Sequence, residues 1–321
     1  MFHHVKELQF NARVSEPDPR FARLLLEQFG GANGELKAAL QYFVQAFPVR
    51  QTHPETYDLL MDIATEEFSH LEIVGATIQM LLGSLNGELK QLDIAGQGAI
   101  ESLVKAGKMK DQLLDMALAN PQFMVLSGGS PRWTDSMGNP FSGAYVNGNG
   151  DPTVDLRSNI AAESRAKIVY EYLMQFTDDP HVKETMGFLM TREIAHFQMF
   201  SAALAQIEPN FPPGVHQGDP RYTHLYFNLS QGEDAIGPWN EGQGPWPAGE
   251  QWVRVDDPQR YVEQTDGLLG QPVVGGEKEP GVIEQMNREL SDLRSTEITS
   301  KVPTGENQWS TYVEKPRTKR R

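Results

Sequence analysis

The chain contains, at residues 65–70, the stretch Thr65-Glu66-Glu67-Phe68-Ser69-His70. Within it, Glu67 and His70 form a Glu-x-x-His step, inside a run whose pattern indicates a helix. Two residues three apart lie on one face of a helix. A carboxylate and an imidazole that face inward at this spacing are what a helix bundle needs to hold a metal ion between its helices. The stretch therefore predicts a helical bundle with a metal ion in its core.

The helix around this stretch is predicted to start at His53-Pro54, because proline suits the first turn of a helix. Its inward stripe alternates spacings of three and four residues: Leu60, Ile63, Glu67, His70, Val74, Thr77 and Leu81. Residues at these spacings face the core of a bundle. Glu67 and His70 therefore stand where Leu or Ile would normally be. Unpaired charge in such a position costs several kcal/mol, so a compensating group is required.

The same step recurs in a later predicted helix, which starts at Asp178-Asp179-Pro180 and runs to about Gln206. Here the pair is Glu193 and His196. The stripe of this helix has the same alternation: Met186, Leu189, Glu193, His196, Phe200 and Ala203. One Glu-x-x-His step says little by itself, whereas two in matched helical contexts indicate a metal site.

Each of these two helices follows a helix that offers another inward Glu. The first of the preceding helices runs from about Arg20 to Phe47, is ended by Pro48, and carries Glu35. The second runs from Asp155 or Asn159 to Phe176 and carries Glu163. Gly30, Gly31 and Gly34 each cost about 1 kcal/mol in a helix relative to Ala. They predict a break, or a close approach by another helix, beside Glu35.

Four carboxylates and two imidazoles that converge in a bundle core make a two-metal site. Ligands that are rich in carboxylate and free of thiolate suit manganese or iron better than zinc or copper. Two redox metals that share bridging carboxylates can transfer two electrons together, as peroxide and dioxygen chemistry requires. The alternative is a buried ion network without metal. It is disfavoured because two His and four Glu in core positions need more compensation than pairing with one another supplies.

The composition excludes several other kinds of site. The chain of 321 residues has no Cys, so disulfides, thiolate nucleophiles, iron–sulfur clusters and thiolate zinc sites are excluded. A net charge of -15 argues against non-specific nucleic-acid binding. The one basic cluster, residues 315–321, is interpreted as a solvated tail or one docked on an acidic neighbouring subunit.

Nothing in the hydrophobic pattern indicates a membrane protein. Hydrophobic residues make up 39% of the chain, but none of their runs reaches the length of about 18 residues that a membrane span needs. Residues 1–6 lack the apolar stretch of a secretory signal. Together with the absence of Cys, this favours a cytoplasmic location.

The rest of the chain is predicted to be less regular. Residues from about 84 to 158 form a long insertion between the bundle helices. It contains a helix from Ala99 to Leu118 and a turn at residues 147–150 that suits a hairpin. After Pro209 the sequence becomes rich in Pro, Gly and Trp, which predicts little regular structure apart from one short helix, Val282 to Leu293.

The sequence resembles the non-haem manganese catalase family, along the bundle and into the tail. The motifs that carry the resemblance are Gly31-Ala32-Asn33-Gly34-Glu35-Leu36, Ala64-Thr65-Glu66-Glu67-Phe68-Ser69-His70-Leu71-Glu72, Asn159-Ile160-Ala161-Ala162-Glu163 and Arg192-Glu193-Ile194-Ala195-His196. The resemblance implies an all-α, ferritin-like four-helix bundle over residues 1–207, followed by an extended, mostly irregular segment over residues 208–321. It implies disproportionation of hydrogen peroxide to water and dioxygen, at two manganese ions that cycle by two electrons.

The resemblance also implies roles for single residues. Glu67 would bridge the two manganese ions. Glu35 and His70 would complete the site of one ion. Glu163 and His196 would complete the site of the other ion. Two further residues would be catalytic without binding metal: Glu193 as a carboxylate that relays protons, and Tyr42 as a hydrogen-bonding group near the cluster. Core packing is the alternative role for Tyr42. Ala162 stands where some members carry an Arg that guards the approach to the metals.

A calcium site and a hexamer are also implied by the resemblance. Asp58 and Asp62 lie four apart on one helix, and residues 228–232 resemble a loop that donates oxygen atoms to calcium in a family member. The ligands from this loop would be Asn228, Ser230 and Gly232. A solvated Asp pair is the alternative. The Trp-rich segment after residue 208 is expected to pack across neighbouring subunits of a homohexamer.

Two other functions fit the same bundle. One is a di-iron ferroxidase or peroxidase, which uses the same ligand pattern with iron. The other is a metal-storage or structural subunit without catalysis. The metal that is bound, and the release of oxygen from peroxide, separate these functions from a manganese catalase.

Overall fold

The computed structural model describes residues 3–83, 107–207, 213–214, 222, 225–227, 229 and 253–266. The chain divides into two compact units, Met1–Gln217 and Gly218–Arg321. The first unit is the predicted helical bundle. Its long helices are α1 (Pro19–Gly30), α2 (Glu35–Val49), α3 (Pro54–Leu82), α7 (Pro152–Met174) and α8 (Pro180–Gln206).

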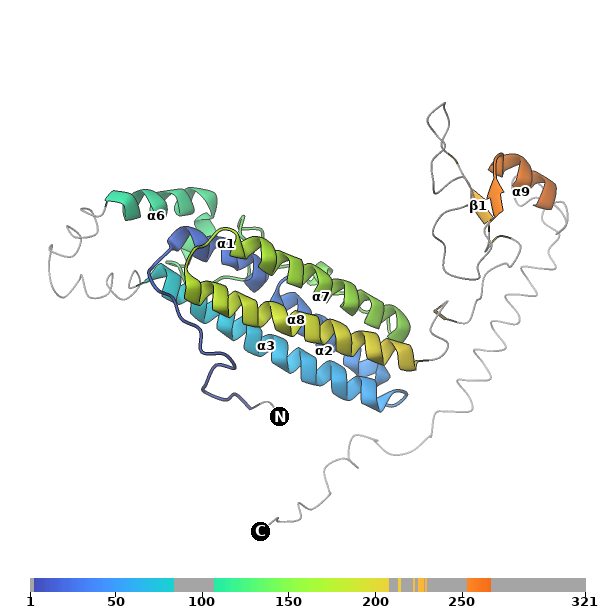
Figure 1. The fold of residues 1–321 in the computed structure, drawn as a ribbon, viewed down its shortest axis with the longest axis horizontal. Helices are drawn as coiled ribbons and strands as arrows, with labels where there is room; N and C mark the ends of the chain where they lie inside the picture. The colour runs from blue at the N-terminus through green and yellow to red at the C-terminus, as the bar shows by residue number, and fades with distance from the viewer. Residues whose placement is uncertain are drawn as a thin grey trace, which may run out of the picture. The chain divides into compact units, whose positions relative to one another are not determined.

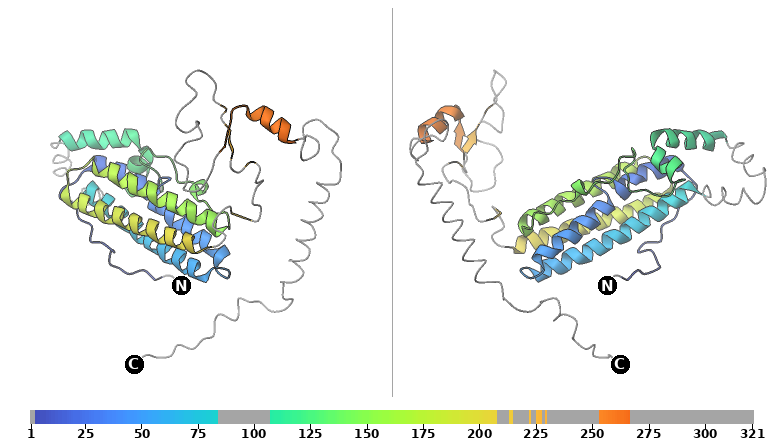
Figure 2. Two further views of the ribbon diagram at one scale, coloured as in Figure 1. Left: turned by 45° about the vertical axis from the view of Figure 1, so that its right-hand side comes forward. Right: turned by 180° about the vertical axis from the view of Figure 1, so that it is seen from behind.

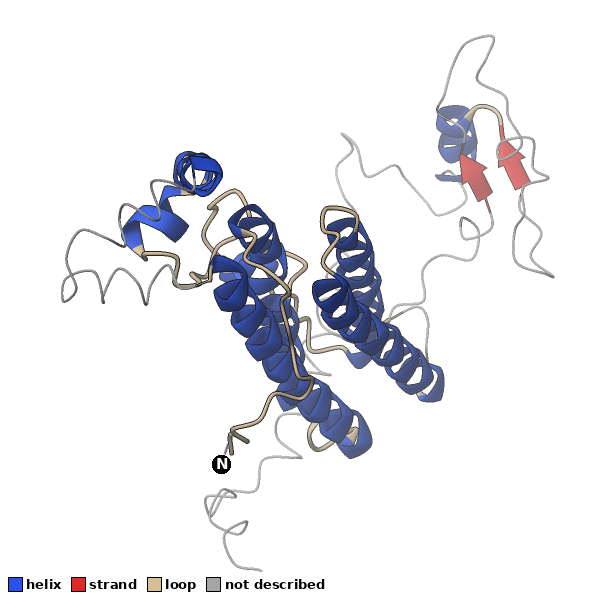
Figure 3. Cartoon of the chain, turned by 60° about the vertical axis from the view of Figure 1, so that its left-hand side comes forward, coloured by secondary structure: helices blue, strands red, loops and turns tan. Residues whose placement is uncertain are grey.

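The bundle consists of two pairs of helices. Helix α2 packs along α3, and α7 packs along α8, while α1 lies against α3 (Figure 1). The pairing is also visible in Figure 3, where α7 and α8 form a group separate from the other long helices. Within each pair, the first helix carries one of the predicted glutamates and the second carries a Glu-x-x-His step. The predicted all-α, ferritin-like bundle is confirmed.

The predicted core stripes of α3 and α8 are buried, except at the last position of the α8 stripe, Ala203, which is half-buried. In α3, the stripe from Leu60 to Leu81 is at most 2% exposed at every position named above, including Glu67 and His70. In α8, the stripe from Met186 to Phe200 is fully buried. The polar residues thus stand in the same row as aliphatic ones, as the spacing predicts.

The predicted break beside Glu35 is present. Residues 31–34 separate α1 from α2, and Glu35 is the first residue of α2. A Cβ atom on Gly34 would lie 2.6 Å from the carbonyl oxygen of Gln28, so a larger residue would displace the chain at this turn. The predicted end at Phe47 is wrong by two residues, because Pro48 lies within the last turn of α2, which ends at Val49.

Helix α7 begins earlier than predicted. Its first residue is Pro152 instead of Asp155 or Asn159, because the Asp151 side chain accepts hydrogen bonds from the backbone N–H groups of Thr153 and Val154. The predicted hairpin at residues 147–150 is wrong, since no strands flank this segment. The N–H groups of Asn149 and Gly150 instead donate to Asp155.

The insertion packs against the α1 end of the bundle. Its described elements are α6 (Gly107–Ala119), the π-helical turn η1 (Gln122–Leu126) and the 3₁₀ turn η2 (Gly143–Tyr145). Trp133 stacks on Phe29 of α1 with ring centroids 4.8 Å apart. The Gln79 side chain of α3 donates to the carbonyl oxygen of Gly129. The predicted helix from Ala99 to Leu118 corresponds to α6 from Gly107 onward, and residues 99–106 lie outside the described part.

The second unit is described in part. Strands β1 (Leu225–Phe227) and β2 (Val253–Val255) pair in parallel, with Tyr226 opposite Arg254. Helix α9 (Pro258–Asp266) follows them (Figure 2). The Tyr261 ring of this helix meets the Phe227 ring edge to face. The sequence did not predict these elements. The predicted helix from Val282 to Leu293 and the basic tail lie outside the described residues.

The core of the bundle has a polar layer between two apolar clusters. One cluster, around α1, includes Phe29, Ile73 and Leu189. The other includes Leu60 and Phe200. The layer between the clusters holds the candidate functional site.

Within the described part of the chain, no helix is both long and apolar enough to span a membrane.

Candidate metal centre

Four helices deliver six buried ionisable side chains to one place in the polar layer. They are Glu35 of α2, Glu67 and His70 of α3, Glu163 of α7, and Glu193 and His196 of α8. None of the six is more than 1% exposed. The structure therefore brings together every residue that the sequence analysis placed at the metal pair.

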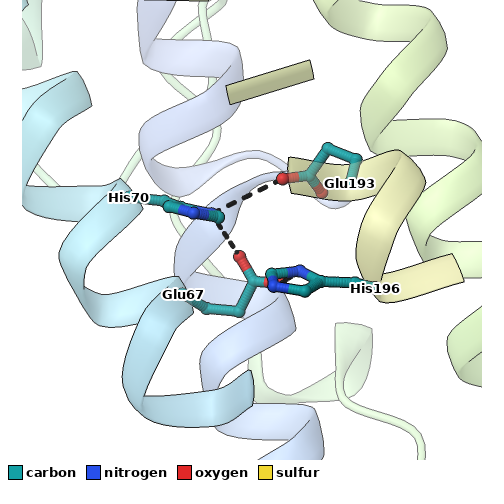
Figure 4. Close-up of side chains that lie close together, drawn as sticks. All are labelled: Glu67, His70, Glu193 and His196. Carbon is teal, nitrogen blue, oxygen red and sulfur yellow. Dashed lines mark hydrogen bonds and ion pairs between the residues drawn. The ribbon is translucent and has the colours of Figure 1, made fainter. Parts of the chain in front are cut away.

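Glu67 lies between the two imidazoles. Its Oε2 is 3.0 Å from Nδ1 of His70, and its Oε1 is 2.9 Å from Nδ1 of His196. Glu193 approaches from the opposite helix, with its Oε1 3.5 Å from Nδ1 of His70 (Figure 4). These four residues each offer a ligand atom within 4.8 Å of the others. One carboxylate thus presents one oxygen to each histidine.

Glu35 and Glu163 complete the two sides of the cluster. Glu35 Oε2 lies 3.6 Å from Nδ1 of His70. On the other side, Glu163 Oε2 lies 3.9 Å from Nδ1 of His196. Each histidine therefore has its own flanking glutamate and shares Glu67 with the other histidine.

Two buried tyrosines link the halves of the repeat. The Tyr42 hydroxyl donates to Oε1 of Glu163 at 2.5 Å. The Tyr170 hydroxyl donates to Oε1 of Glu35. Each tyrosine follows one of these glutamates by seven residues but bonds the glutamate of the other half. Tyr170 was not predicted to be part of the site, although its spacing of seven residues from Glu163 matches that of Tyr42 from Glu35.

Glu66 is a further part of the site that the sequence analysis missed. Its Oε2 accepts a hydrogen bond from Nε2 of His196 at 3.0 Å, and its Oε1 lies 3.5 Å from Nε2 of His70. Arg192 also donates to both oxygens of Glu66, and Gln9 donates to one of them. A single carboxylate therefore contacts the outer nitrogen of both imidazoles. The signal in the sequence was its position four residues before His70.

Glu66 also faces the outside of the bundle. A groove of about 840 Å³ between the N-terminal segment and α3 is lined by Glu66 together with His4, Asp62 and Glu72. The Glu66 side chain is 20% exposed, whereas both imidazoles behind it are fully buried. Glu66 thus separates the metal-facing layer from this groove.

Burial and mutual repulsion raise the pKa values of three of the inner carboxyls. Burial, followed by the charge of Glu193, raises the pKa of Glu35 well above its ordinary value. Burial, followed by the charges of Glu193 and then Glu67, also raises the pKa of Glu163 well above its ordinary value. The pKa of Glu193 is raised by burial and then by Glu67. A cation among these groups would relieve the repulsion.

The two histidines, together with Glu66 and Glu67, are shifted toward their ionised forms. Burial opposes ionisation in each case and is outweighed by the neighbouring groups of opposite charge. The nearby carboxylates of Glu66 and Glu67 raise the pKa of His196 to about 9. Those of Glu193, Glu35, Glu66 and Glu67 raise the pKa of His70 well above its ordinary value. Bonds from the two histidines hold the pKa values of Glu66 and Glu67 well below the usual range.

The donor set fits a metal ion. Several buried atoms that face the centre of the cluster have no hydrogen-bond partner among the described residues: Glu35 Oε2, Glu67 Oε1, Glu163 Oε2 and His196 Nδ1. Buried polar atoms normally have partners, so such a concentration requires a compensating group. Oxygen and imidazole donors without thiolate suit manganese or iron.

The predicted calcium ligands are not brought together by the described residues. Asp58 and Asp62 are exposed on α3. Asn228, Ser230 and Gly232 lie outside the described part of the chain. A calcium site therefore stays a prediction.

Comparison with known proteins agrees with the site. The sequence model of the family described as manganese containing catalase matches residues 1–292. A probable manganese catalase of Clostridium acetobutylicum is 40% identical over 232 residues, covering 72% of this chain and 91% of the relative. The manganese catalase of Bacillus subtilis is 32% identical over 282 residues, covering 85% of this chain and 97% of the relative.

A solved structure resembles the bundle as well. The crystal structure of KatB, a manganese catalase from Anabaena PCC7120, is similar with a TM-score of 0.62 and 39% sequence identity. The match covers 80% of this chain and 100% of that chain.

Proposed function

This chain belongs to the manganese catalase family, and we propose that it holds two manganese ions among α2, α3, α7 and α8. Its reaction is the disproportionation of hydrogen peroxide to water and dioxygen. The observation that carries the proposal is the position of Glu67, which presents one oxygen to each of two histidines. A carboxylate placed in this way is suited to bridge two ions.

The other proposed ligands form two sets, one on each side of Glu67. Glu35 and His70 would hold one ion, and Glu163 and His196 the other, because each pair lies on one side of Glu67. The imidazoles would bind through Nδ1, since Nδ1 faces the carboxylates inside and Nε2 faces Glu66. A carboxylate only accepts hydrogen bonds, so it keeps the proton on Nε2 and leaves the Nδ1 lone pair for metal.

When bound, manganese supplies the two-electron redox chemistry of the reaction. The chain supplies orientation and proton transfer. The Tyr42 and Tyr170 hydroxyls fix the carboxyl groups of Glu163 and Glu35, each through one oxygen, and leave the other oxygen directed toward the centre. Among the described residues, no hydroxyl group bonds Glu193, and its pKa is raised, which suits a group that takes up and releases protons.

Replacing Glu193 with glutamine is expected to leave the manganese content unchanged and to lower turnover by about 10²- to 10⁴-fold. The amide keeps the shape of the side chain but cannot exchange a proton at this position. Elemental analysis measures the metal, and a Clark electrode measures oxygen release. Loss of manganese in Glu193→Gln would place this side chain among the ligands instead, and wild-type turnover would remove it from proton transfer.

The metal-free protein is expected to lose stability as pH rises from about 6.5 to about 9. The pKa of His196 is raised from 6.5 to about 9 on folding, so the folded protein keeps a proton that the unfolded chain releases in this interval. This contribution is fully present below pH 6.5 and disappears as pH passes 9, a loss on the order of 3 kcal/mol from His196. The raised pKa values of Glu35, Glu163 and Glu193 act in the same direction.

Urea unfolding of chelator-treated protein at several pH values measures this effect. The exposed His4 provides the control, because His4→Gln should leave the slope of stability against pH intact. His196→Gln should reduce the slope of stability against pH. Stability that stays level or increases across the interval would contradict the protonation pattern. Manganese affinity should rise over the same interval, since the protons must leave before the nitrogens bind metal.

The proposed function is tested by growing cells with both manganese and iron and analysing the purified protein. Two manganese ions per chain together with rapid oxygen release from peroxide support the proposal. Iron with peroxide consumption but no oxygen identifies a di-iron peroxidase or ferroxidase. Bound metal without turnover identifies a storage or structural subunit.

Three predictions about the rest of the chain stay proposals. We propose that residues 1–207 form the metal-binding domain and that residues 208–321 hold a homohexamer together. A chain truncated after residue 207 should then elute as a smaller species than the full chain in size-exclusion chromatography.

We also propose calcium binding at Asp58 and Asp62 with the loop at residues 228–232. Asp58→Asn should abolish calcium binding in isothermal titration calorimetry if the site exists.

A further inference from the structure

The residue before each Glu-x-x-His step differs between the two halves of the repeat. It is Glu66 in α3 and Arg192 in α8, and in both helices a threonine precedes it. Each lies four residues before a histidine of the centre and so shares a helical face with it. Two equivalent positions thus carry opposite charges, and the structure pairs them. The scheme above assigns Glu66 to the histidines and gives Arg192 no role.

Arg192 bonds both oxygens of Glu66. Its Nε donates to Oε1 at 2.7 Å, and its Nη2 donates to Oε2 at 3.2 Å. The same two oxygens face the histidines, since Oε2 accepts from Nε2 of His196 at 3.0 Å and Oε1 lies 3.5 Å from Nε2 of His70. A guanidinium group that holds both oxygens of a carboxylate fixes its plane as well as its position. Arg192 therefore fixes how this carboxylate lies between the two imidazoles.

Glu66 has an alternative position that this double bond from Arg192 opposes. Glu66 lines the groove of about 840 Å³, and its side chain is 20% exposed. Water in the groove would hydrate a carboxylate that turned outward, whereas a carboxylate held against two buried imidazoles gives up part of its hydration. The exposed Gln9 adds one neutral bond to Oε1 at 2.8 Å, which is weaker than a bond from a charged donor. Arg192 is therefore the main attraction that keeps Glu66 turned inward.

We propose that Arg192 is a positioning residue of the metal centre, which acts through Glu66 on the imidazoles of His70 and His196. The inference rests on the proposed function, because both histidines are taken as metal ligands. A carboxylate held against both Nε2 atoms keeps a proton on each of them and leaves each Nδ1 free to bind metal. Arg192 itself would touch neither metal nor peroxide. Its removal should therefore weaken metal binding only where Glu66 is present.

The test is a double-mutant cycle on manganese affinity, measured with chelator-treated protein by competition with a metal-binding dye. Arg192→Met keeps an apolar side chain without donors, so manganese should bind roughly 10-fold more weakly. In the Glu66→Ala background, Arg192→Met should cause no further weakening, because the group through which it acts is absent. Arg192→Lys keeps the charge but lacks the planar pair of donors, so its affinity should lie between those of the wild type and Arg192→Met.

The matched control is Arg13→Met. Arg13 also forms an ion pair with a glutamate, Glu184 of α8, at 2.8 Å, but this pair does not include Glu66. Arg13→Met should therefore bind manganese like the wild type. If Arg192→Met does not fold, Arg192→Lys carries the same cycle in both backgrounds.

Other roles for Arg192 predict different results. If its charge acted directly on the metal ion, its removal would tighten manganese binding, because like charges repel. If it only joined α3 to α8, Arg192→Met would unfold at lower urea concentration, and manganese affinity would be unchanged or would fall equally in both backgrounds. Tighter binding, unchanged binding, or an equal loss with and without Glu66 would each refute the proposal.

The role of Arg192 and the proposed function can fail separately. Wild-type protein that binds manganese but releases no oxygen from peroxide would refute the function, whereas the cycle would still decide the role of Arg192. If iron is the metal that the protein binds, the same cycle is measured with Fe²⁺. Wild-type protein that binds neither metal would refute both.

Discussion

Glu67→Ala is expected to lose both manganese ions and to reduce oxygen release from peroxide to the level of the metal-free protein. Glu67 is the carboxylate that lies at the inner nitrogen, Nδ1, of both histidines, at 3.0 Å from His70 and 2.9 Å from His196. Its removal takes a ligand from each proposed ion at once. It also leaves the two imidazoles without their shared inner acceptor. A fall in turnover of about 10³-fold or more is expected, because the metal supplies the redox chemistry.

Elemental analysis and oxygen release on the same preparation measure this result. Glu67→Gln serves as a second variant that keeps the side-chain shape if Glu67→Ala does not fold, and it should also lose manganese. Glu72→Ala is the matched control, because Glu72 lies on the same helix and bonds only the exposed His4 among the contacts described. A Glu67→Ala protein that keeps two manganese ions and full activity would refute the site.

Glu66→Gln is expected to weaken manganese binding by more than the roughly 10- to 100-fold that is usual for a residue supporting one metal ligand. Glu66 contacts Nε2 of both imidazoles, so its carboxylate keeps the proton on the outer nitrogen of each. A glutamine amide offers one acceptor and one donor in place of two acceptors. One of the two histidines would then lose its acceptor and could hold its proton on Nδ1, the atom that faces the centre.

Competition with a metal-binding dye measures the affinity of Glu66→Gln. The turnover lost at limiting manganese should be recovered in part by added manganese, which distinguishes weakened binding from a lost catalytic group. Glu72→Gln, on the same face of the groove, should bind manganese like the wild type. Unchanged affinity in Glu66→Gln would show that the imidazoles are oriented by their inner contacts alone.

The bundle and the inner ligands were predictable because helical periodicity fixes which residues share a face. Glu67 and His70 occupy a stripe that is otherwise aliphatic, and the structure buries both of them. The same reasoning applies to Glu193 and His196. A charged residue in a buried helical stripe predicts a nearby compensating group, because unpaired buried charge is costly. Since the Glu-x-x-His pattern occurs twice, it predicts that both helices face the same compensating group.

Glu66 and Tyr170 were not predicted because periodicity does not identify their partners. Glu66 is partly exposed and looks like an ordinary surface glutamate in the sequence, but its oxygens bond His196 and Arg192 of α8. Tyr170 bonds a glutamate that is 135 positions away in the chain. Partnerships of this kind depend on how the two helix pairs dock. Helix α7 starts before the predicted residue because the Asp151 side chain caps it, which the apolar periodicity does not reveal.

The crossed tyrosine bonds make the two helix pairs interdependent. Tyr42 belongs to the pair α2–α3 and bonds the glutamate of α7, while Tyr170 belongs to the pair α7–α8 and bonds the glutamate of α2. Glu66 adds a third link, from α3 to Arg192 of α8. Neither pair alone therefore contains both its glutamate ligand and the tyrosine that positions that ligand. A fragment that contains only one pair would retain a metal ion poorly. The centre can form only after the pairs have docked, so metal retention reports on the assembly of the whole bundle.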